Sequence, residues 1–212
     1  SQAGIIEAIS DAVSIHQIKN RTGCSLEGYF RQEYGLDSDS YNRAKKAFIH
    51  SLAGYSLFQY IFQVRDRHNG NILLGHQGHI IHIDFGYILG QSPKNISFET
   101  SPFKMSVDFL ELLEGSGSDL FLYFKSLMYF GFMALRKHMD KLIVLVDIMK
   151  AGDAFPCLGS KGHSVENLKS RFKIELSDDK VKIFMEKLIN QSTNSLTTFI
   201  YDKFQYYTNG IR

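Results

Sequence analysis

The sequence predicts an α+β fold that is mostly helical and contains one small β-hairpin. The chain has 212 residues, of which 44% are apolar and 22% charged, and this is enough to bury a sizeable core. Most segments repeat apolar residues at intervals of three and four, the period of an α-helix. Only two short runs, on either side of Gly75 and Gly78, have the pattern that is typical of strands.

In the first half of the chain, the hairpin follows two expected helices. Residues 1–20 are apolar with mixed spacing and permit either a short helix or pieces of strand. Ser25 is placed to cap a helix that Gly35 ends. A longer helix is expected over about 44–62, where apolar residues become dense enough for a buried helix. The strands of the hairpin are expected at Asn71–Leu74 and His79–Asp84.

After the hairpin, the sequence predicts one long loop and then only helices. Gly86–Pro102 has no periodicity, and loops of this length are uncommon unless they are functional. The expected helices are Ser106–Leu113, Ser118–Arg136, Lys141–Met149, Ser164–Arg171, Ser177–Asn190 and Ser195–Tyr207, with serines repeatedly at capping positions. One apolar stripe is expected to lie in the core because its spacing is helical. Its members are Leu142, Ile143, Leu145, Val146 and Met149.

Composition excludes several classes of protein. Lys and Arg number 24 against 22 Asp and Glu, and the resulting charge of +2 is too weak to indicate a nucleic-acid partner. No apolar run reaches the roughly 18 residues of a membrane span, so no transmembrane segment is expected. Cys24 and Cys157 are isolated and no secretory leader is evident, which favours a reducing, cytoplasmic setting.

The residues with the clearest chemical pattern surround the predicted hairpin. Asp66 and Asn71 lie five positions apart in a loop, and Asp84 opens an Asp-Phe-Gly sequence after the second strand. Phosphoryl transfer from ATP needs an acid or base near the attacking hydroxyl and oxygen ligands for magnesium. An antiparallel hairpin returns the chain, so that Asn71 and Asp84 can share one metal ion. The sequence therefore predicts a kinase site, with Mg²⁺ or Mn²⁺ as cofactor and ATP as co-substrate.

The order Asp-Arg-His at 66–68 reverses the His-Arg-Asp order of protein kinases. In this form, followed by His-Ile-Asp-Phe-Gly, the sequence resembles the phosphoinositide 3-kinase and 4-kinase superfamily, and within it the type III phosphatidylinositol 4-kinases of the beta form. The likeness covers essentially the whole chain. Further segments that fit are Ser14–Gln17, Ala53–Tyr55, Gly78–Gly86, Phe98–Thr100, Ala134–His138, Phe204–Tyr206 and Asn209–Ile211.

The resemblance implies a role for each matching residue. Asp66 and His68 match the positions that orient or deprotonate the inositol hydroxyl, and which of the two takes the proton stays open. His68 has an ordinary pKa near neutrality, which suits a general base. The implied set is Asp66, His68 and Arg67 for catalysis, Asn71 and Asp84 for the metal, and Leu73 and Ile83 for the floor of the adenine pocket.

The implied segments are a catalytic loop at 63–71, an activation loop at 82–106 and a C-terminal helix at 195–212. The activation loop meets the lipid headgroup in this superfamily, and its only cations here are Lys94 and Lys104. Two lysines suit a headgroup with one phosphodiester, so phosphatidylinositol is the expected substrate. The choice of the 4-hydroxyl rests on resemblance alone. The C-terminal helix is expected either to pack on the lobe or to lie on a membrane surface.

No glycine-rich phosphate loop and no strand lysine precede Asp66. Residues 1–212 are therefore expected to be a single C-terminal lobe of a protein-kinase-like fold, without the N-terminal lobe and with little turnover alone. The resemblance further implies a peripheral place on Golgi or other cytosolic-facing membranes. Small GTPases or adaptors are possible partners.

Three alternatives stay open beside this interpretation. A phosphatidylinositol 3-kinase or a related protein kinase would use the same motifs, although the latter usually end in a tail that contains Trp, and this chain has none. A non-catalytic membrane docking module would have no chemical need of Asp66, Asn71 and Asp84. A zinc site among the histidines at 68, 76, 79 and 82 is disfavoured, because positions 79 and 82 face opposite sides of a strand.

Overall fold

The computed structural model describes residues 5–91, 101–151 and 164–211. Its sheet is antiparallel, with the strands β1 (Ala12–Ser14), β2 (Ile72–Gly75) and β3 (Ile80–His82) in that spatial order. The hairpin of β2 and β3 confirms the prediction, with Leu73 opposite Ile81. The third strand, β1, comes from the N-terminal segment that the sequence left open.

Serine caps set the starts of the first helices. Ser14 and Gln17 cap α1 (Ile15–Thr22) reciprocally, with 3.1 Å from the Gln17 amide to the Ser14 hydroxyl. Ser25 caps α2 (Leu26–Tyr34), which ends before Gly35 as predicted. The long helix α3 (Asp39–Phe62) begins earlier than expected because Ser38 caps it, 3.0 Å from the Tyr41 amide.

The C-terminal half confirms the expected run of helices. They are α4 (Val107–Leu112), α5 (Asp119–Lys137), α6 (Met139–Ala151), α7 (Ser164–Arg171), α8 (Asp178–Thr193) and α9 (Leu196–Asn209). Ser106 and Ser118 cap α4 and α5 as the sequence indicated. Together with the small sheet, these helices confirm a mostly helical α+β fold. Within the described residues, no helix is long and apolar enough to span a membrane.

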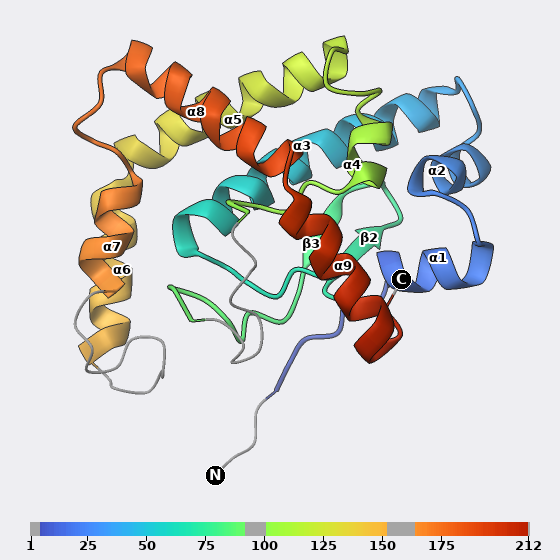
Figure 1. The fold of residues 1–212 in the computed structure, drawn as a ribbon, viewed down its shortest axis with the longest axis horizontal. Coiled ribbons are helices and arrows are strands. Elements are labelled where there is room, and N and C mark those ends of the chain that lie inside the picture. The colour runs from blue at the N-terminus through green and yellow to red at the C-terminus, as the bar shows by residue number, and fades with distance from the viewer. Residues whose placement is uncertain (1–4, 92–100, 152–163, 212) are drawn as a thin grey trace.

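The long helix α3 forms the centre of the fold. It contacts α2, α5, α7 and β3, and α5 in turn packs on α8 (Figure 1). Figure 1 also shows α6 and α7 together at one side and α9 in front of the sheet. Of the 17 phenylalanines in the sequence, seven lie in the core with rings that are 0–1% exposed. These are Phe30, Phe48, Phe103, Phe109, Phe124, Phe132 and Phe172.

The core prediction for α6 is wrong for two residues of its stripe. Ile143 and Val146 are buried, but Leu145 is 58% and Met149 47% exposed. Consecutive apolar residues cannot all lie on one face of a helix, and α6 makes its main helix contact with α7. Only the face that packs inward is therefore covered.

Candidate active site

Two loops meet where α3 and β3 end, and backbone hydrogen bonds join them. The first follows α3 and holds Asp66, and the second follows β3 and holds Asp84. The Arg65 amide donates to the Tyr87 carbonyl at 2.9 Å, and the Leu89 amide to the Phe62 carbonyl at 2.7 Å. The structure thus places side by side the two segments that the sequence marked for catalysis.

Both predicted acids have strained backbones. The φ angles of Asp66 and Asp84 are 64° and 56°, in the left-handed region that few residues other than glycine adopt. Aspartate tolerates this region better than most residues, yet it still costs energy that the surrounding structure must balance. Such strain concentrates at functional sites, and here it falls on two positions chosen from sequence for their chemistry.

Arg67 is completely buried and clamps the two loops together. Its guanidinium donates to the carbonyl of Ile83 at 2.6 Å, to that of Arg65 at 3.0 Å and to that of Asp84. The guanidinium also lies 5.5 Å from the centre of the Phe85 ring. These contacts fix the backbone of both loops, and Arg67 therefore supports the geometry of the site.

The hairpin brings the two predicted metal ligands together. The amide of Ile83 donates to the Asn71 carbonyl at 3.0 Å, so that Asn71 lies opposite the residue before Asp84. The Asn71 side-chain nitrogen donates to the Asp66 carbonyl at 3.0 Å, which leaves the amide oxygen as the possible cation ligand. Asp84 is exposed, and one carboxylate oxygen accepts from the Gly86 amide at 3.2 Å. One carboxylate and one amide oxygen suit Mg²⁺, which keeps several waters and binds phosphate oxygens.

His68 and Asp66 lie next to each other at the mouth of the loop. The His68 Nε2 atom is 4.0 Å from Asp66 Oδ2, and His68 Nδ1 accepts from the Gly70 amide at 3.1 Å. Burial lowers the pKa of His68, with Lys104 and Arg67 acting in the same direction and Asp66 and Asp84 opposing it. The ring is therefore neutral near pH 7, and its proton lies on Nε2, facing Asp66.

One face of the sheet forms an apolar floor beside these loops. The opposite face is buried against α3 through Ile72, Leu74, Ile80 and His82. Leu73 and Ile83 point the other way, since side chains alternate along a strand, and both are half-buried. Ile81, opposite Leu73, shares this floor; the sequence reasoning missed it, although the same alternation would have found it.

The structure describes one of the two lysines that were predicted to contact the headgroup. Lys94 lies outside the described residues. Lys104 is 4% exposed, and its ammonium is paired with Asp202 of α9. A headgroup contact by Lys104 stays a prediction that requires this ion pair to open.

Helix α9 adds one residue, Tyr201, that sequence reasoning did not find. The Tyr201 hydroxyl donates to Asp66, across 135 positions of sequence. No local pattern links residues that far apart, so only the fold reveals the contact.

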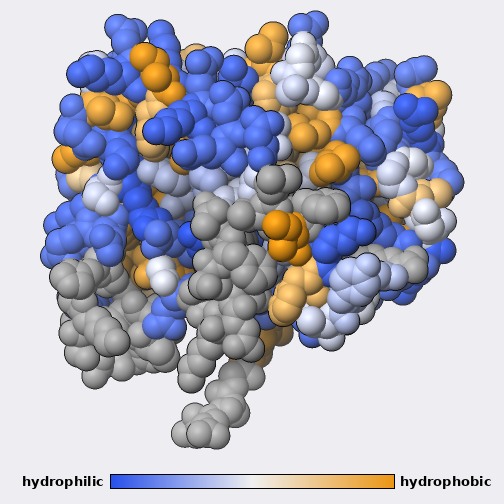
Figure 2. Space-filling model, viewed as in Figure 1, coloured by the Kyte–Doolittle hydropathy of each residue, from blue (hydrophilic) through white to orange (hydrophobic). Residues whose placement is uncertain are grey.

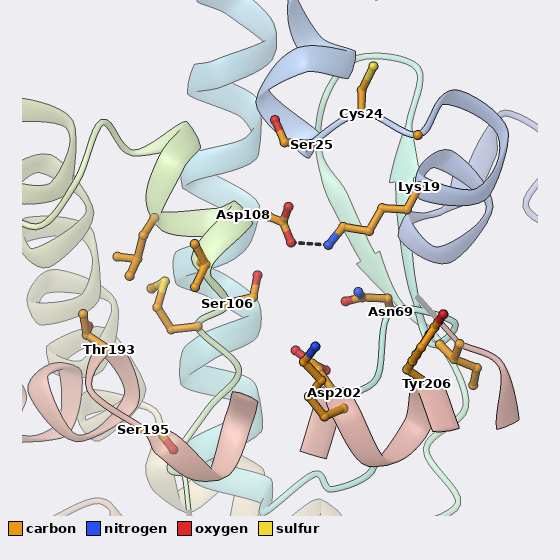
Figure 3. A pocket seen from close by; sticks show the side chains of 16 residues that line it. Lys19, Cys24, Ser25, Asn69, Ser106, Asp108, Thr193, Ser195, Asp202 and Tyr206 are labelled. Atoms are coloured by element: carbon orange, nitrogen blue, oxygen red, sulfur yellow. Dashed lines mark hydrogen bonds and ion pairs between the residues drawn. The ribbon is translucent and has the colours of Figure 1, made fainter. Parts of the chain in front are cut away.

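A cavity of about 570 Å³ adjoins the catalytic loop at Asn69. It lies between α1, α4 and α9, and Figure 3 shows Asp202 and Tyr206 of α9 along one side of it. The Lys19–Asp108 ion pair, at 2.5 Å, lines the other side. On this side, the two charged side chains that line the cavity are therefore paired with each other.

Comparison with known proteins agrees with this geometry. Residues 3–157 match the family described as phosphatidylinositol 3- and 4-kinase. Phosphatidylinositol 4-kinase beta of Danio rerio is 47% identical over 212 residues, which are all of this chain and 25% of that protein. Those of Rattus norvegicus and Mus musculus are 46% identical, with 26% of each covered. The chain spans about a quarter of the length of these curated relatives.

The family match covers more than half of the chain and confirms the resemblance that the motifs indicated. The geometry around Asp66, Asn71 and Asp84 fits the same assignment. This chain belongs to the phosphatidylinositol 3- and 4-kinase family.

Proposed function

We propose that this chain is the C-terminal lobe of a kinase that transfers the γ-phosphoryl group of ATP to the inositol 4-hydroxyl of phosphatidylinositol. The observation that best supports this is the hairpin, which sets Asn71 and Asp84 together beside Asp66. The relatives are named phosphatidylinositol 4-kinase beta, which supports the lipid and the 4-position.

The chain's residues position and neutralise the reacting groups. Asn71 and Asp84 would hold Mg²⁺, which when bound neutralises charge on the phosphates. Since the His68 proton lies on Nε2, we assign Asp66 as the group that accepts the hydroxyl proton. His68 then keeps the carboxylate facing the substrate. Arg67 would serve catalysis by holding the backbone of both loops.

Leu73, Ile81 and Ile83 form the surface on which the adenine ring would rest. Their half-buried side chains lie on the sheet face that turns away from α3. An apolar floor suits a flat aromatic base, since pockets for such ligands are mostly apolar with few polar groups. The activation loop at 82–106 and Lys94 are proposed to meet the headgroup. The kinase would act at Golgi or other cytosolic-facing membranes.

A phosphorylation assay of the full-length protein tests the proposal. It uses phosphatidylinositol vesicles with Mg-ATP, resolves the position of the new phosphate, and compares wild type with Asp84→Ala. We expect a 4-phosphate, and at least about 10²-fold lower turnover in the variant, the order of one lost transition-state electrostatic contact. Asp179→Ala, which removes an exposed carboxylate on α8, is the matched control and should keep full activity.

Other outcomes would redirect the proposal. A 3-phosphate would overturn the regiochemistry, and near-normal turnover of Asp84→Ala would overturn the metal assignment. ATP binding without lipid product would favour a protein kinase. No ATP binding at all would favour a docking module.

A further inference from the structure

We propose that Tyr201 of α9 is a positioning residue for phosphoryl transfer, whose hydroxyl holds the Asp66 carboxylate in its working orientation. The inference rests on the proposed function, because it assigns Tyr201 a part in the same site. Tyr201 is 2% exposed, and its hydroxyl donates to Asp66 Oδ1. Nothing in the motif around Asp66 indicates this residue.

Hydrogen bonds along one face of α9 fix the direction in which the Tyr201 hydroxyl donates its proton. Gln205, 3% exposed, donates from Nε2 to the Tyr201 hydroxyl oxygen at 2.8 Å. Asn209 donates in turn to Gln205 Oε1 at 2.6 Å. The three residues are four positions apart and so share a helix face. Because the phenol oxygen accepts from Gln205, its own proton is directed to Asp66.

The two oxygens of the Asp66 carboxylate have different neighbours. Oδ1 is held by Tyr201, whereas Oδ2 lies 4.0 Å from His68 Nε2. The backbone of Asp66 is left-handed, with φ at 64°, and its carbonyl binds the Asn71 side chain. Both the main chain and the side chain of Asp66 are therefore fixed, and orientation of this kind is worth large factors in rate.

The next residue of α9 joins the other loop. Asp202 pairs with Lys104, whose amide donates to Gln59 Oε1 of α3 at 2.9 Å. Consecutive residues of α9 thus reach the catalytic loop and the end of the activation-loop segment. This second anchor explains how a C-terminal helix can hold Tyr201 to the accuracy that a positioning role needs.

The test compares wild type with Tyr201→Phe in the full-length protein, on phosphatidylinositol vesicles. Phenylalanine keeps the ring and removes only the hydroxyl. We expect kcat to fall about 10-fold or more, because misplacing a reacting group by about 1 Å costs about 10²-fold. The KM for ATP should stay unchanged, since Tyr201 belongs to α9 and the proposed adenine floor to the sheet.

Tyr41→Phe is the matched control. Tyr41 is also buried, at 5% exposure, and its hydroxyl also donates to a carboxylate, Glu27 Oε1, at 2.6 Å. It lies at the far end of α3, roughly 30 Å from the catalytic loop at 1.5 Å per residue. This variant should lose stability like Tyr201→Phe but keep kcat. A purely structural role would move both variants alike.

A double-mutant cycle shows whether Tyr201 acts through Asp66. In an Asp66→Ala background, Tyr201→Phe should cause no further loss, because groups that act as a unit are not additive. Equal losses in both backgrounds, or an unchanged kcat in Tyr201→Phe, would overturn the inference. A wild-type protein that makes no phosphatidylinositol phosphate would instead overturn the proposed function.

Gln205→Leu provides a second variant in case Tyr201→Phe does not fold, which circular dichroism would reveal. It keeps the phenol and removes the donor that directs the phenol proton. We expect a smaller loss of kcat than in Tyr201→Phe, again at constant KM for ATP. Full activity in a folded Gln205→Leu protein would contradict the claim that Gln205 directs the Tyr201 proton to Asp66.

Discussion

At the scale of single residues, the candidate site gathers features that are costly elsewhere. Two aspartates are left-handed, and the charged Arg67 is completely buried. A buried cation is tolerated only when its donors are satisfied, and Arg67 gives them to backbone carbonyls of both loops. The charge is therefore used to hold geometry, because the fork of a guanidinium reaches several acceptors at once.

Arg67→Lys should lower both stability and turnover. A lysine offers one nitrogen and cannot reach all the carbonyls that Arg67 serves, and each buried carbonyl left unpaired costs about 1–3 kcal/mol. We expect a lower melting temperature and at least about 10-fold lower turnover, because the Asp84 backbone loses its support. Thermal unfolding and the vesicle assay measure the two effects.

Arg136→Lys is the control for this prediction. Arg136 of α5 likewise donates to backbone carbonyls, those of Lys173, Ile174 and Leu176 at 3.2, 3.3 and 2.7 Å, but these lie in the segment between α7 and α8. This variant should melt earlier and keep its turnover. If both arginine variants lose turnover equally, Arg67 has no specific effect on the site.

His82 should make the protein less stable in acid. Burial, aided by Arg67 and Lys104, lowers the pKa of His82 to about 3, against 6.5 in an unfolded chain. Below pH 6.5, His82 binds a proton in the unfolded state but stays neutral in the folded state. The free energy of unfolding therefore falls as the pH drops from 6.5 towards 3. His82→Phe keeps a ring to stack on Tyr55, now 4.3 Å from His82, and removes the titration.

Melting temperatures between pH 7 and pH 5 test this prediction. The wild type should lose more stability over this interval than His82→Phe. His76→Phe, at an exposed turn position, should retain the wild-type dependence. If the melting temperatures of wild type and His82→Phe change equally with pH, His82 does not cause the loss of stability in acid.

At the scale of elements, local signals were predictable and distant pairings were not. Ser25 and Ser118 marked helix starts because a cap lies within three residues of the amide that it binds. The strand β1 has only three residues and exists through pairing with β2, some sixty positions away. Its formation depends on tertiary contact, which periodicity cannot reveal.

The same distinction explains what was predictable about the site. Asp66, Asn71 and Asp84 could be predicted to lie together because a loop and a hairpin relate them locally. Tyr201 lies 135 positions from Asp66, and Lys104 was assigned to the headgroup without knowledge of its partner Asp202. Charge and spacing indicate what a residue offers, whereas burial and pairing depend on the assembled fold.

Gly78→Ala should weaken the hairpin severely. Gly78 has φ of 90°, and a Cβ there would lie 2.6 Å from the Ala44 carbonyl oxygen of α3. Backbone cannot move aside easily, so the clash adds to the cost of the left-handed conformation, and overpacking of this kind costs about 1–3 kcal/mol. Gly115→Ala is the matched control, with φ of 88° and no atom within 4 Å of a Cβ.

Denaturant unfolding of both glycine variants measures the clash alone. The free energy of unfolding should fall further for Gly78→Ala than for Gly115→Ala, because the two share the backbone cost. Equal losses would mean that the turn shifts away from α3 without penalty. The prediction thus tests how firmly the hairpin, and with it Asp84, is seated on α3.

At the scale of the whole molecule, the candidate site lies where α3, the hairpin and α9 converge (Figure 1). On the face shown in Figure 2, hydrophobic side chains form several separate patches, and a small one lies near the middle, in the region where α9 lies in Figure 1. Ile200 of α9 is 52% exposed and Tyr207 is 77% exposed. An exposed apolar surface beside the site fits the proposed function, because the proposed lipid substrate stays in a bilayer.

Ile200→Asp should weaken binding of the full-length protein to vesicles. Removing an apolar side chain and adding a negative charge opposes both the apolar and the electrostatic parts of interfacial binding. We expect about a tenfold loss in sedimentation with vesicles of phosphatidylinositol and phosphatidylserine, equivalent to about 1.4 kcal/mol. Val144→Asp on α6, at 54% exposure, is the matched control and should sediment like the wild type.

Activity on a short-chain, water-soluble phosphatidylinositol separates membrane binding from catalysis. Ile200→Asp should keep its turnover there, because the inward face of α9, with Tyr201 and Gln205, is unchanged. Loss of turnover on the soluble lipid would place Ile200 in the support of the site. Equal sedimentation of the two aspartate variants would remove α9 from the membrane contact. These measurements therefore test the two faces of α9 separately, one for the proposed support of Asp66 and one for the proposed contact with the bilayer.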